Sequence, residues 1–227
     1  MIEGVVFDLD GLLLDSEQVW DTAREQLARE RGGRWHANAQ RDMMGMSSGE
    51  WARYMHDVIG LPEPPEEINR EIVSRLEAIY HDRLPVLPGA REAVERIGAR
   101  WPLALASSSN RELIELALEL LGVAELFRAT VSSEEVGRGK PAPDVYLEAA
   151  RRLGVEPARA AAVEDSHNGI RAAKSAGLRV IAIPNAHFAP GPDALAEADV
   201  VLDSLDDLIP EAIDPSASAS GPSRRSG

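Results

Sequence analysis

The chain has 227 residues, enough to bury the core of one large domain or of one domain with a smaller insert. Its 38 acidic and 24 basic side chains leave a formal charge of −14, whose field repels nucleic acids and anionic membranes, so we expect neither as a partner. Cysteine is absent, which excludes disulfides and thiolate chemistry. Because we find neither a signal segment nor a run of about 18 apolar residues, we expect a cytoplasmic protein. A monomer is the default expectation.

The first apolar run, residues 5–7, is short and rich in β-branched and aromatic residues, which predicts a buried strand. It ends on Asp8, and Asp10 follows two positions later. Two carboxylates beside a core are costly unless a cation neutralises them, and Mg²⁺ prefers oxygen ligands. The same pair can attack phosphorus and exchange a proton with the leaving oxygen. The alternative is a solvated turn, which the apolar residues 12–14 on the far side disfavour.

Residues 16–84 contain no convincing strand but two helical patterns, separated by the proline-rich stretch 61–65. Both patterns space apolar residues three or four apart. They consist of Trp20, Ala23 and Leu27, and of Ile68, Ile72, Leu76 and Ile79. We expect a helical cap domain over residues 16–84, inserted above the catalytic edge, where it can exclude water and select the substrate.

Short apolar runs and helix-period segments alternate along the rest of the chain. The runs are residues 103–106, 129–131, 160–163 and 180–183, with a weaker one at 200–202. In the first helical segment Leu113, Ala117, Leu120 and Leu121 share one face before Gly122, and Ser109 and Glu112 form a plausible capping box at its start. The second carries Val145, Leu147, Ala150 and Leu153 before Gly154, and the third runs from about 168 to 176 before Gly177. The alternation predicts an α/β fold with a doubly wound parallel sheet, over residues 1–15 and 85–213, followed by a flexible tail at 214–227.

The carboxyl ends of the predicted strands carry polar residues, and in such sheets ligands bind at that edge. Besides the first strand's aspartates, these are Ser107 to Ser109, Lys140, Glu164, Asp165 and Ser166. Each has an ordinary alternative, because the serines can cap helices, the lysine can be solvated and the acids can face a helix N-terminus. Together they match what phosphoryl transfer needs: a nucleophile, an acid or base, metal ligands, a cation and hydroxyl donors.

Four motifs carry a resemblance to a known family: Asp8 with Asp10, Ser107 to Ser109, Lys140, and Glu164 to Ser166. In this order they resemble the motifs of haloacid dehalogenase superfamily phosphohydrolases with a helical cap, near the β-phosphoglucomutase and sugar-phosphate phosphatase branch. The resemblance extends over residues 2–209 and implies a Rossmann-like core and a bound Mg²⁺. It implies that Asp8 is the nucleophile and a metal ligand, and that Asp10 is the general acid/base and binds the metal through its backbone carbonyl. An acidic residue at position 10 argues against a dehalogenase proper, which has no alkoxide to protonate.

The resemblance also assigns the remaining core residues. Ser107 would hydrogen-bond the phosphoryl group, helped by the Ser108 backbone or by Asn110. Lys140 would neutralise the nucleophile and the phosphoryl charge. Glu164 and Asp165 would complete the metal site.

The cap residues favour a phosphatase over a mutase. β-Phosphoglucomutases have a histidine on the first cap helix and an arginine in a cap loop, where this chain has Trp20 and Ser48. We therefore expect a Mg²⁺-dependent phosphatase that hydrolyses a small phosphorylated metabolite, a sugar or sugar-alcohol phosphate, through an aspartyl-phosphate. The alternatives are a hexose phosphate mutase and a non-catalytic metal-binding interaction module. The candidate substrate contacts in the cap are Trp20, Met46 and Ser47, whereas Met43, Met44 and Met46 can also be packing residues.

Overall fold

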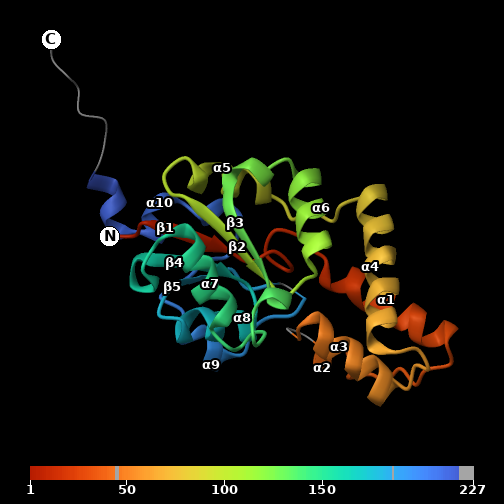
Figure 1. Cartoon of the computed structure of the whole chain (residues 1–227). Helices are drawn as coiled ribbons and strands as arrows, with labels where there is room; N and C mark the ends of the chain where they lie inside the picture. The colour runs from red at the N-terminus through yellow and green to blue at the C-terminus, as the bar shows by residue number, and fades with distance from the viewer. Residues whose placement is uncertain (44–45, 186, 220–227) are drawn as a thin grey trace, which may run out of the picture.

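The computed structural model describes residues 1–43, 46–185 and 187–219, and within them six strands form one parallel sheet (Figure 1). The strands are β1 (Gly4–Phe7), β2 (Leu103–Ser107), β3 (Phe127–Ser132), β4 (Ala160–Glu164), β5 (Arg179–Ala182) and β6 (Val200–Val201). Their order in the sheet is β3-β2-β1-β4-β5-β6, with every pairing parallel. The predicted α/β class with a doubly wound sheet is therefore confirmed.

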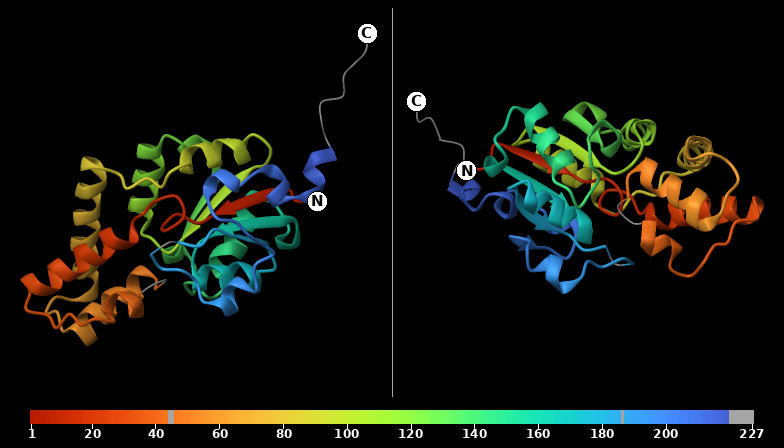
Figure 2. Two further views of the ribbon diagram at one scale, coloured as in Figure 1. Left: turned by 180° about the vertical axis from the view of Figure 1, so that it is seen from behind. Right: turned by 60° about the horizontal axis from the view of Figure 1, so that its bottom comes forward.

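Helices cover both faces of the sheet (Figure 2). They are α5 (Ala90–Gly98), α6 (Arg111–Leu121), α7 (Asp144–Leu153), α8 (His167–Ser175), α9 (Pro192–Leu195) and α10 (Pro210–Ile213). Alternate residues of β1 point to opposite faces, so Val5 and Phe7 pack in one apolar cluster with α5 and α6. Val6 packs in a second cluster with α7 and α8. Because both faces are buried, the central strands read as continuous apolar runs.

The helix ends agree with the predicted glycine stops, but two expectations about the helices were wrong. Gly122 and Gly154 end α6 and α7 in the left-handed conformation, which a residue without a Cβ adopts at no steric cost. The residue before α6 is Asn110 and not Ser109, so the predicted capping box does not form. Leu120 and Leu147, which belong to the apolar patterns of these helices, are 44% and 41% exposed and do not face the core.

Four helices between residues 16 and 84 lie to one side of the sheet, beyond the carboxyl ends of its strands (Figure 1). They are α1 (Glu17–Glu30), α2 (Ala39–Met43), α3 (Ser48–Tyr54), extended by a π-helical turn at Met55–Ile59, and α4 (Pro65–Asp82). Only α1 and α4 were predicted, because α2 and α3 are too short to show a period. Tyr80 is buried on α4, whereas the predicted Ile79 is partly exposed. The division into a cap at 16–84 and a core at 1–15 and 85–213 stays a prediction.

Residues that follow α10 lie against the start of the chain. The Asp214 carboxylate accepts a hydrogen bond from the backbone amide of Ile2 at 2.7 Å, and a 3₁₀ helix follows at Pro215–Ala219. The rest of the expected tail, residues 220–227, lies outside the described part of the chain. No helix in the described part is long and apolar enough to span a membrane.

Candidate active site

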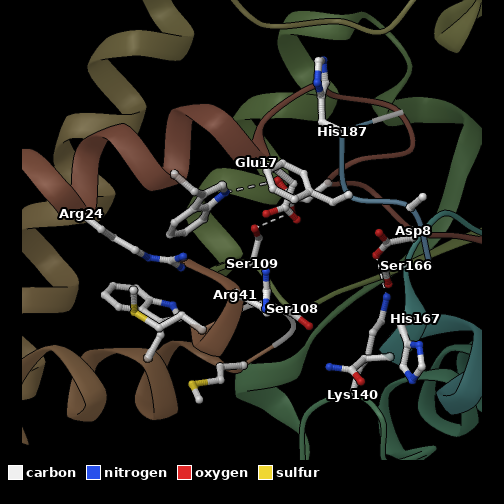
Figure 3. Close-up of a pocket in the computed structure, with 18 of the residues that line it drawn as sticks. Asp8, Glu17, Arg24, Arg41, Ser108, Ser109, Lys140, Ser166, His167 and His187 are labelled. Carbon is white, nitrogen blue, oxygen red and sulfur yellow. Dashed lines mark hydrogen bonds and ion pairs between the residues drawn. The ribbon is translucent and has the colours of Figure 1, made fainter. Parts of the chain in front are cut away.

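The centre of the site is a buried ion-pair cluster of Asp8, Lys140 and Glu164, which are 5%, 7% and 0% exposed. Figure 3 shows Asp8 and Lys140. Lys140 Nζ lies 2.7 Å from Asp8 Oδ1 and 2.6 Å from Glu164 Oε1. Burial disfavours the charged ammonium, but the charges of Asp8 and Glu164 raise the pKa of Lys140 above its ordinary value. Three segments more than 20 residues apart in sequence therefore meet at the carboxyl edge of the sheet, and Lys140 is not the solvated lysine that was the alternative.

Both carboxylate oxygens of Glu164 are occupied by donors within the protein. Oε1 accepts from Lys140 and from the Tyr146 hydroxyl at 2.7 Å. Oε2 accepts from the backbone amides of Asp165 and Ser166, at 3.0 and 3.1 Å, and from the Ser166 hydroxyl at 3.0 Å. Burial alone would raise the pKa of Glu164, but Lys140 and these donors lower it. We therefore propose that Glu164 orients Lys140 and does not bind a metal directly.

Asp165 sits where a divalent cation fits. Ligand oxygens of Asp8, Glu164 and Asp165 all lie within 4.8 Å of one another. Oδ1 of Asp165 is buried and has no hydrogen-bond partner among the described residues. A Cβ on Gly11 would lie 2.1 Å from Asp165 Oδ2, so only glycine leaves room for this carboxylate. A buried, unpaired carboxylate oxygen beside a second carboxylate is a donor set suited to a hard cation.

Asp10 lies at the edge of the same cavity and is fixed by four donors. Oδ1 accepts from the Ser16 hydroxyl at 2.5 Å and from Trp20 Nε1 at 3.3 Å. Oδ2 accepts from the hydroxyls of Ser109 and Ser107, at 2.6 and 3.3 Å. The structure thus directs Ser107 and Trp20 to Asp10, where they can orient the proposed acid/base. A phosphoryl contact of Ser107 stays a prediction.

A cavity of about 600 Å³ opens between the sheet edge and the helices of residues 16–84. Of the predicted site residues, it is lined by Asp8, Asp10, Trp20, Met46, Ser108 and Lys140. The buried Ser108 hydroxyl oxygen has no partner in the described part of the chain and is free to meet a ligand. Met43 also lines the cavity, whereas Met44 lies outside the described residues.

Two predicted substrate contacts, Ser47 and Asn110, are engaged elsewhere and do not line this cavity. The Ser47 amide and hydroxyl both donate to Glu50, at 2.8 and 2.7 Å, in the capping box of α3. The Asn110 amide donates to Asn69 on α4 at 3.1 Å and to Glu134 at 2.8 Å. Asn110 therefore links α4 to the sheet edge.

Several residues that line the cavity were not predicted from the sequence. These are Glu17, Arg24, Arg41, Trp51, His167, Asn168, His187, Phe188, Ala189 and Gly191. Arg24 follows Trp20 by one helical turn and so shares its face, which was a usable signal in the sequence. Trp51 carried no such signal, since it belongs to the short α3.

Replacing Gly169 with alanine is expected to destabilise the protein by about 3 kcal/mol, because the new methyl overlaps a buried charged group. A Cβ at this position would lie 1.8 Å from Glu164 Oε1, whose partner is Lys140. Urea denaturation measures the change. Gly49→Ala is the matched control, since its Cβ meets nothing nearer than Arg53 at 3.9 Å, and we expect it to stabilise α3 by about 0.5 kcal/mol. Equal stability of the Gly169 variant and wild type would contradict the placement of Glu164.

A family model described as "Hydrolase: haloacid dehalogenase-like hydrolase" matches residues 2–177, which is more than half of the chain. This protein belongs to the haloacid dehalogenase-like hydrolases. It is 35% identical over 213 residues to a probable pseudouridine-5'-phosphatase of Drosophila melanogaster, with 91% of each chain covered. It is also 35% identical over 213 residues to hexitol phosphatase B of Escherichia coli K12, with 91% of this chain and 94% of the relative covered.

The fold comparison agrees with this membership of the haloacid dehalogenase-like hydrolases. The crystal structure of CbbY from Rhodobacter sphaeroides in complex with phosphate superimposes with a TM-score of 0.83 at 31% identity, and covers 94% of this chain and 100% of that chain. The predicted family is confirmed, as is the prediction of a phosphoric monoester hydrolase.

Proposed function

We propose that this hydrolase is a Mg²⁺-dependent phosphatase of a small phosphorylated metabolite, a sugar or sugar-alcohol phosphate, and that it works through an aspartyl-phosphate on Asp8. The proposal depends above all on one observation: the Asp8 carboxylate lies 2.7 Å from Lys140 Nζ in a cavity that Asp10 also lines. The similarity to hexitol phosphatase B supports a sugar-alcohol phosphate as substrate.

The proposed chemistry assigns a separate task to each group. A carboxylate oxygen of Asp8 attacks phosphorus, while Lys140 neutralises charge on the nucleophile and on the phosphoryl oxygens. Asp10 donates a proton to the leaving oxygen and then takes one from the water that hydrolyses the aspartyl-phosphate. Ser108, whose hydroxyl has no hydrogen-bond partner among the described residues, donates to the phosphoryl group. A Mg²⁺ held by Asp8, Asp165 and the backbone carbonyl of Asp10 would supply positive charge to the transferring oxygens.

The helices of residues 16–84 supply the other wall of the cavity, so we propose that they exclude water and select the substrate. Trp20, Met46 and Met43 contribute to this wall. We propose that Ser47 and Asn110 act indirectly, because their polar groups are engaged with Glu50, Asn69 and Glu134. A monomeric, cytoplasmic enzyme with no nucleic-acid or membrane partner stays a prediction.

Phosphate release from a panel of phosphorylated sugars, sugar alcohols and an aryl phosphate tests the proposed function. We expect release with Mg²⁺ and none after chelation by EDTA, with recovery when Mg²⁺ is added back. Interconversion of hexose phosphates without free phosphate would contradict hydrolysis in favour of a mutase. No turnover of any phosphate ester would favour a non-catalytic module.

Metal binding is expected to release protons near neutral pH. Burial raises the pKa of Asp8 to about 8, since the Lys140 charge offsets it only in part and the Glu164 charge adds to it. Burial and the charges of Glu164 and Asp8 also raise the pKa of Asp165. Mg²⁺ binds the carboxylate forms, so protons held by the metal-free protein must leave. Titration calorimetry in two buffers of different ionisation enthalpy measures this release. Binding heats that do not depend on the buffer would contradict the raised pKa values.

The same pKa values set how stability depends on pH in EDTA. The folded pKa of Asp8 lies above its ordinary value of 3.8, so the metal-free fold binds more protons than the unfolded chain between about pH 4 and pH 8. Its stability therefore falls as pH rises through this window, and the Tm gain from Mg²⁺ should be larger at pH 8 than at pH 6. A gain that shrinks with rising pH would contradict this linkage.

A further inference from the structure

We propose that Arg24 binds a second anionic group of the substrate, a carboxylate or another phosphoryl group, at the end remote from the ester that is cleaved. This inference rests on the proposed function, because it takes the same cavity as the substrate site. It adds a specificity-determining residue to that site and narrows the substrate class from phosphorylated sugars in general to those with a second anionic group.

The Arg24 guanidinium is buried between two indole rings at the cavity wall. Its central carbon lies 4.6 Å from the centroid of the Trp20 ring and 4.7 Å from that of Trp51. The residue is only 7% exposed and lines the cavity, into which its guanidinium is directed from α1 (Figure 3). The two rings fix the plane of the guanidinium, which presents its donors in a rigid fork suited to a carboxylate or a phosphoryl group.

The hydrogen-bonding capacity of Arg24 is unused in the described part of the chain. It has no hydrogen bond there and no carboxylate within the 4.0 Å of an ion pair, and its buried Nε has no partner. Burial lowers the pKa of Arg24 to about 10, although the charges of Glu17 and Asp21 act in the opposite direction. A buried cation without a hydrogen-bonded counterion is costly, and a bound anion would remove that cost.

Charged residues of both signs line the cavity. Glu17 also lines it, and after burial the strongest influence on its pKa is the charge of Asp10, ahead of that of Arg24. Arg41 adds a second cation to the lining. The carboxylates of Asp10 and Glu17 suit the hydroxyls and leaving oxygen of a sugar phosphate, whereas the guanidinium of Arg24 suits an anion.

Simple packing is the competing explanation, since an arginine between two aromatic rings gains cation–π energy without any ligand. If Arg24 served only for packing, replacing it with a long apolar side chain would leave the substrate preference unchanged. Anion binding predicts a change in preference that depends on the charge of the remote group. The two explanations therefore differ in a ratio of rates and not in activity as such.

Three hexitol derivatives that differ only at C1 test the inference: sorbitol 6-phosphate, 6-phosphogluconate and sorbitol 1,6-bisphosphate. For the wild type, we expect kcat/KM for at least one of the two esters with a second anionic group to exceed that for sorbitol 6-phosphate tenfold or more. Arg24→Met keeps an unbranched apolar side chain between the indoles and should bring this ratio close to one. Arg53→Met, the same change at an exposed position on α3, should leave the ratio at its wild-type value.

The result also shows which anion is meant. Preference for 6-phosphogluconate assigns the group as a carboxylate, and preference for the bisphosphate assigns it as a phosphoryl group. An unchanged ratio in Arg24→Met, or wild-type preference for sorbitol 6-phosphate, would overturn the inference. Rescue of the ratio by Arg24→Lys would support charge recognition, since lysine restores the cation without the planar fork.

Binding without turnover separates this inference from the proposed function. In the Asp8→Asn background, titration of the three esters should change tryptophan fluorescence, because Trp20 and Trp51 flank the proposed anion site. We expect tighter binding of an ester with a second anionic group than of sorbitol 6-phosphate, and loss of that preference when Arg24→Met is added. If the esters with a second anionic group bind more tightly but the wild type hydrolyses none of the three, only the proposed function is contradicted. If the wild type hydrolyses them without this binding preference, only the role of Arg24 is contradicted.

Discussion

Asp8→Asn is expected to lower the rate of phosphate release by about 10⁴-fold or more, because an amide cannot accept phosphorus as a carboxylate does. The change is nearly isosteric, and the amide oxygen can still accept from Lys140, which lies 2.7 Å from Asp8 Oδ1. Steady-state phosphate release with saturating Mg²⁺ measures the loss. Mass spectrometry of rapidly quenched wild-type enzyme should also detect a phosphorylated peptide containing Asp8, absent in the variant.

The stability of the same variant provides its control. Burial and the neighbouring Glu164 charge raise the pKa of Asp8 to about 8, so the ionised form is disfavoured in the metal-free fold. Asp8→Asn removes that ionised group and should raise Tm in EDTA at pH 8, so that lost activity cannot be ascribed to unfolding. A variant that keeps more than a few per cent of wild-type turnover would contradict the role of Asp8 as nucleophile.

Asp10→Ala is expected to lower kcat for an alkyl phosphate by about 10³-fold with a much smaller change in KM, because proton donation matters only in the transition state. An aryl phosphate has a leaving group that needs no proton, so its first step should be nearly normal. The second step lacks its general base and should be slow. Stopped-flow measurements should therefore show a burst of phenolate that equals the enzyme concentration, followed by slow turnover.

Two outcomes would contradict the assignment of Asp10. Equal losses for alkyl and aryl phosphates, without a burst, would mean that Asp10 does not transfer the proton. A kcat near the wild-type value would mean that another group does so. Ser109→Ala is a milder companion variant, because it removes one of the four donors to Asp10, at 2.6 Å, and should reduce kcat only several-fold.

The residues at the centre of the site could be predicted because each follows a buried strand or stands in a motif with a strong local signal. Asp8 and Glu164 come at the ends of apolar runs that can only be central strands, and parallel strands bring their carboxyl ends to one edge. The ends of α6 and α7 were predictable as well, because glycine directly after a helical pattern is a local signal for a helix end. The loss of the capping box at Ser109 was not, because its hydroxyl serves Asp10 and not the helix.

The helices of residues 16–84 were less predictable, because the short ones depend on packing and not on periodicity. α3 has seven residues, too few for a stable isolated helix, and it forms because Trp51 is buried against its neighbours. In the sequence, Arg24 could be seen only as a charged residue on the apolar face of a predicted helix. Its significance depends on Trp51, 27 positions away, which supplies the second ring.

The sequence by itself determined the sheet, its carboxyl edge and the acidic residues gathered there, because strand patterns and chain topology are local properties with few alternatives. Only the tertiary structure decided which donors each carboxylate meets. It directs Glu164 to Lys140 and Tyr146, leaves an oxygen of Asp165 without a partner among the residues that the structure describes, and places Arg24 between two indoles. Such choices depend on side-chain distances of a few ångströms between distant segments, and no pattern of residue types along the chain encodes those distances.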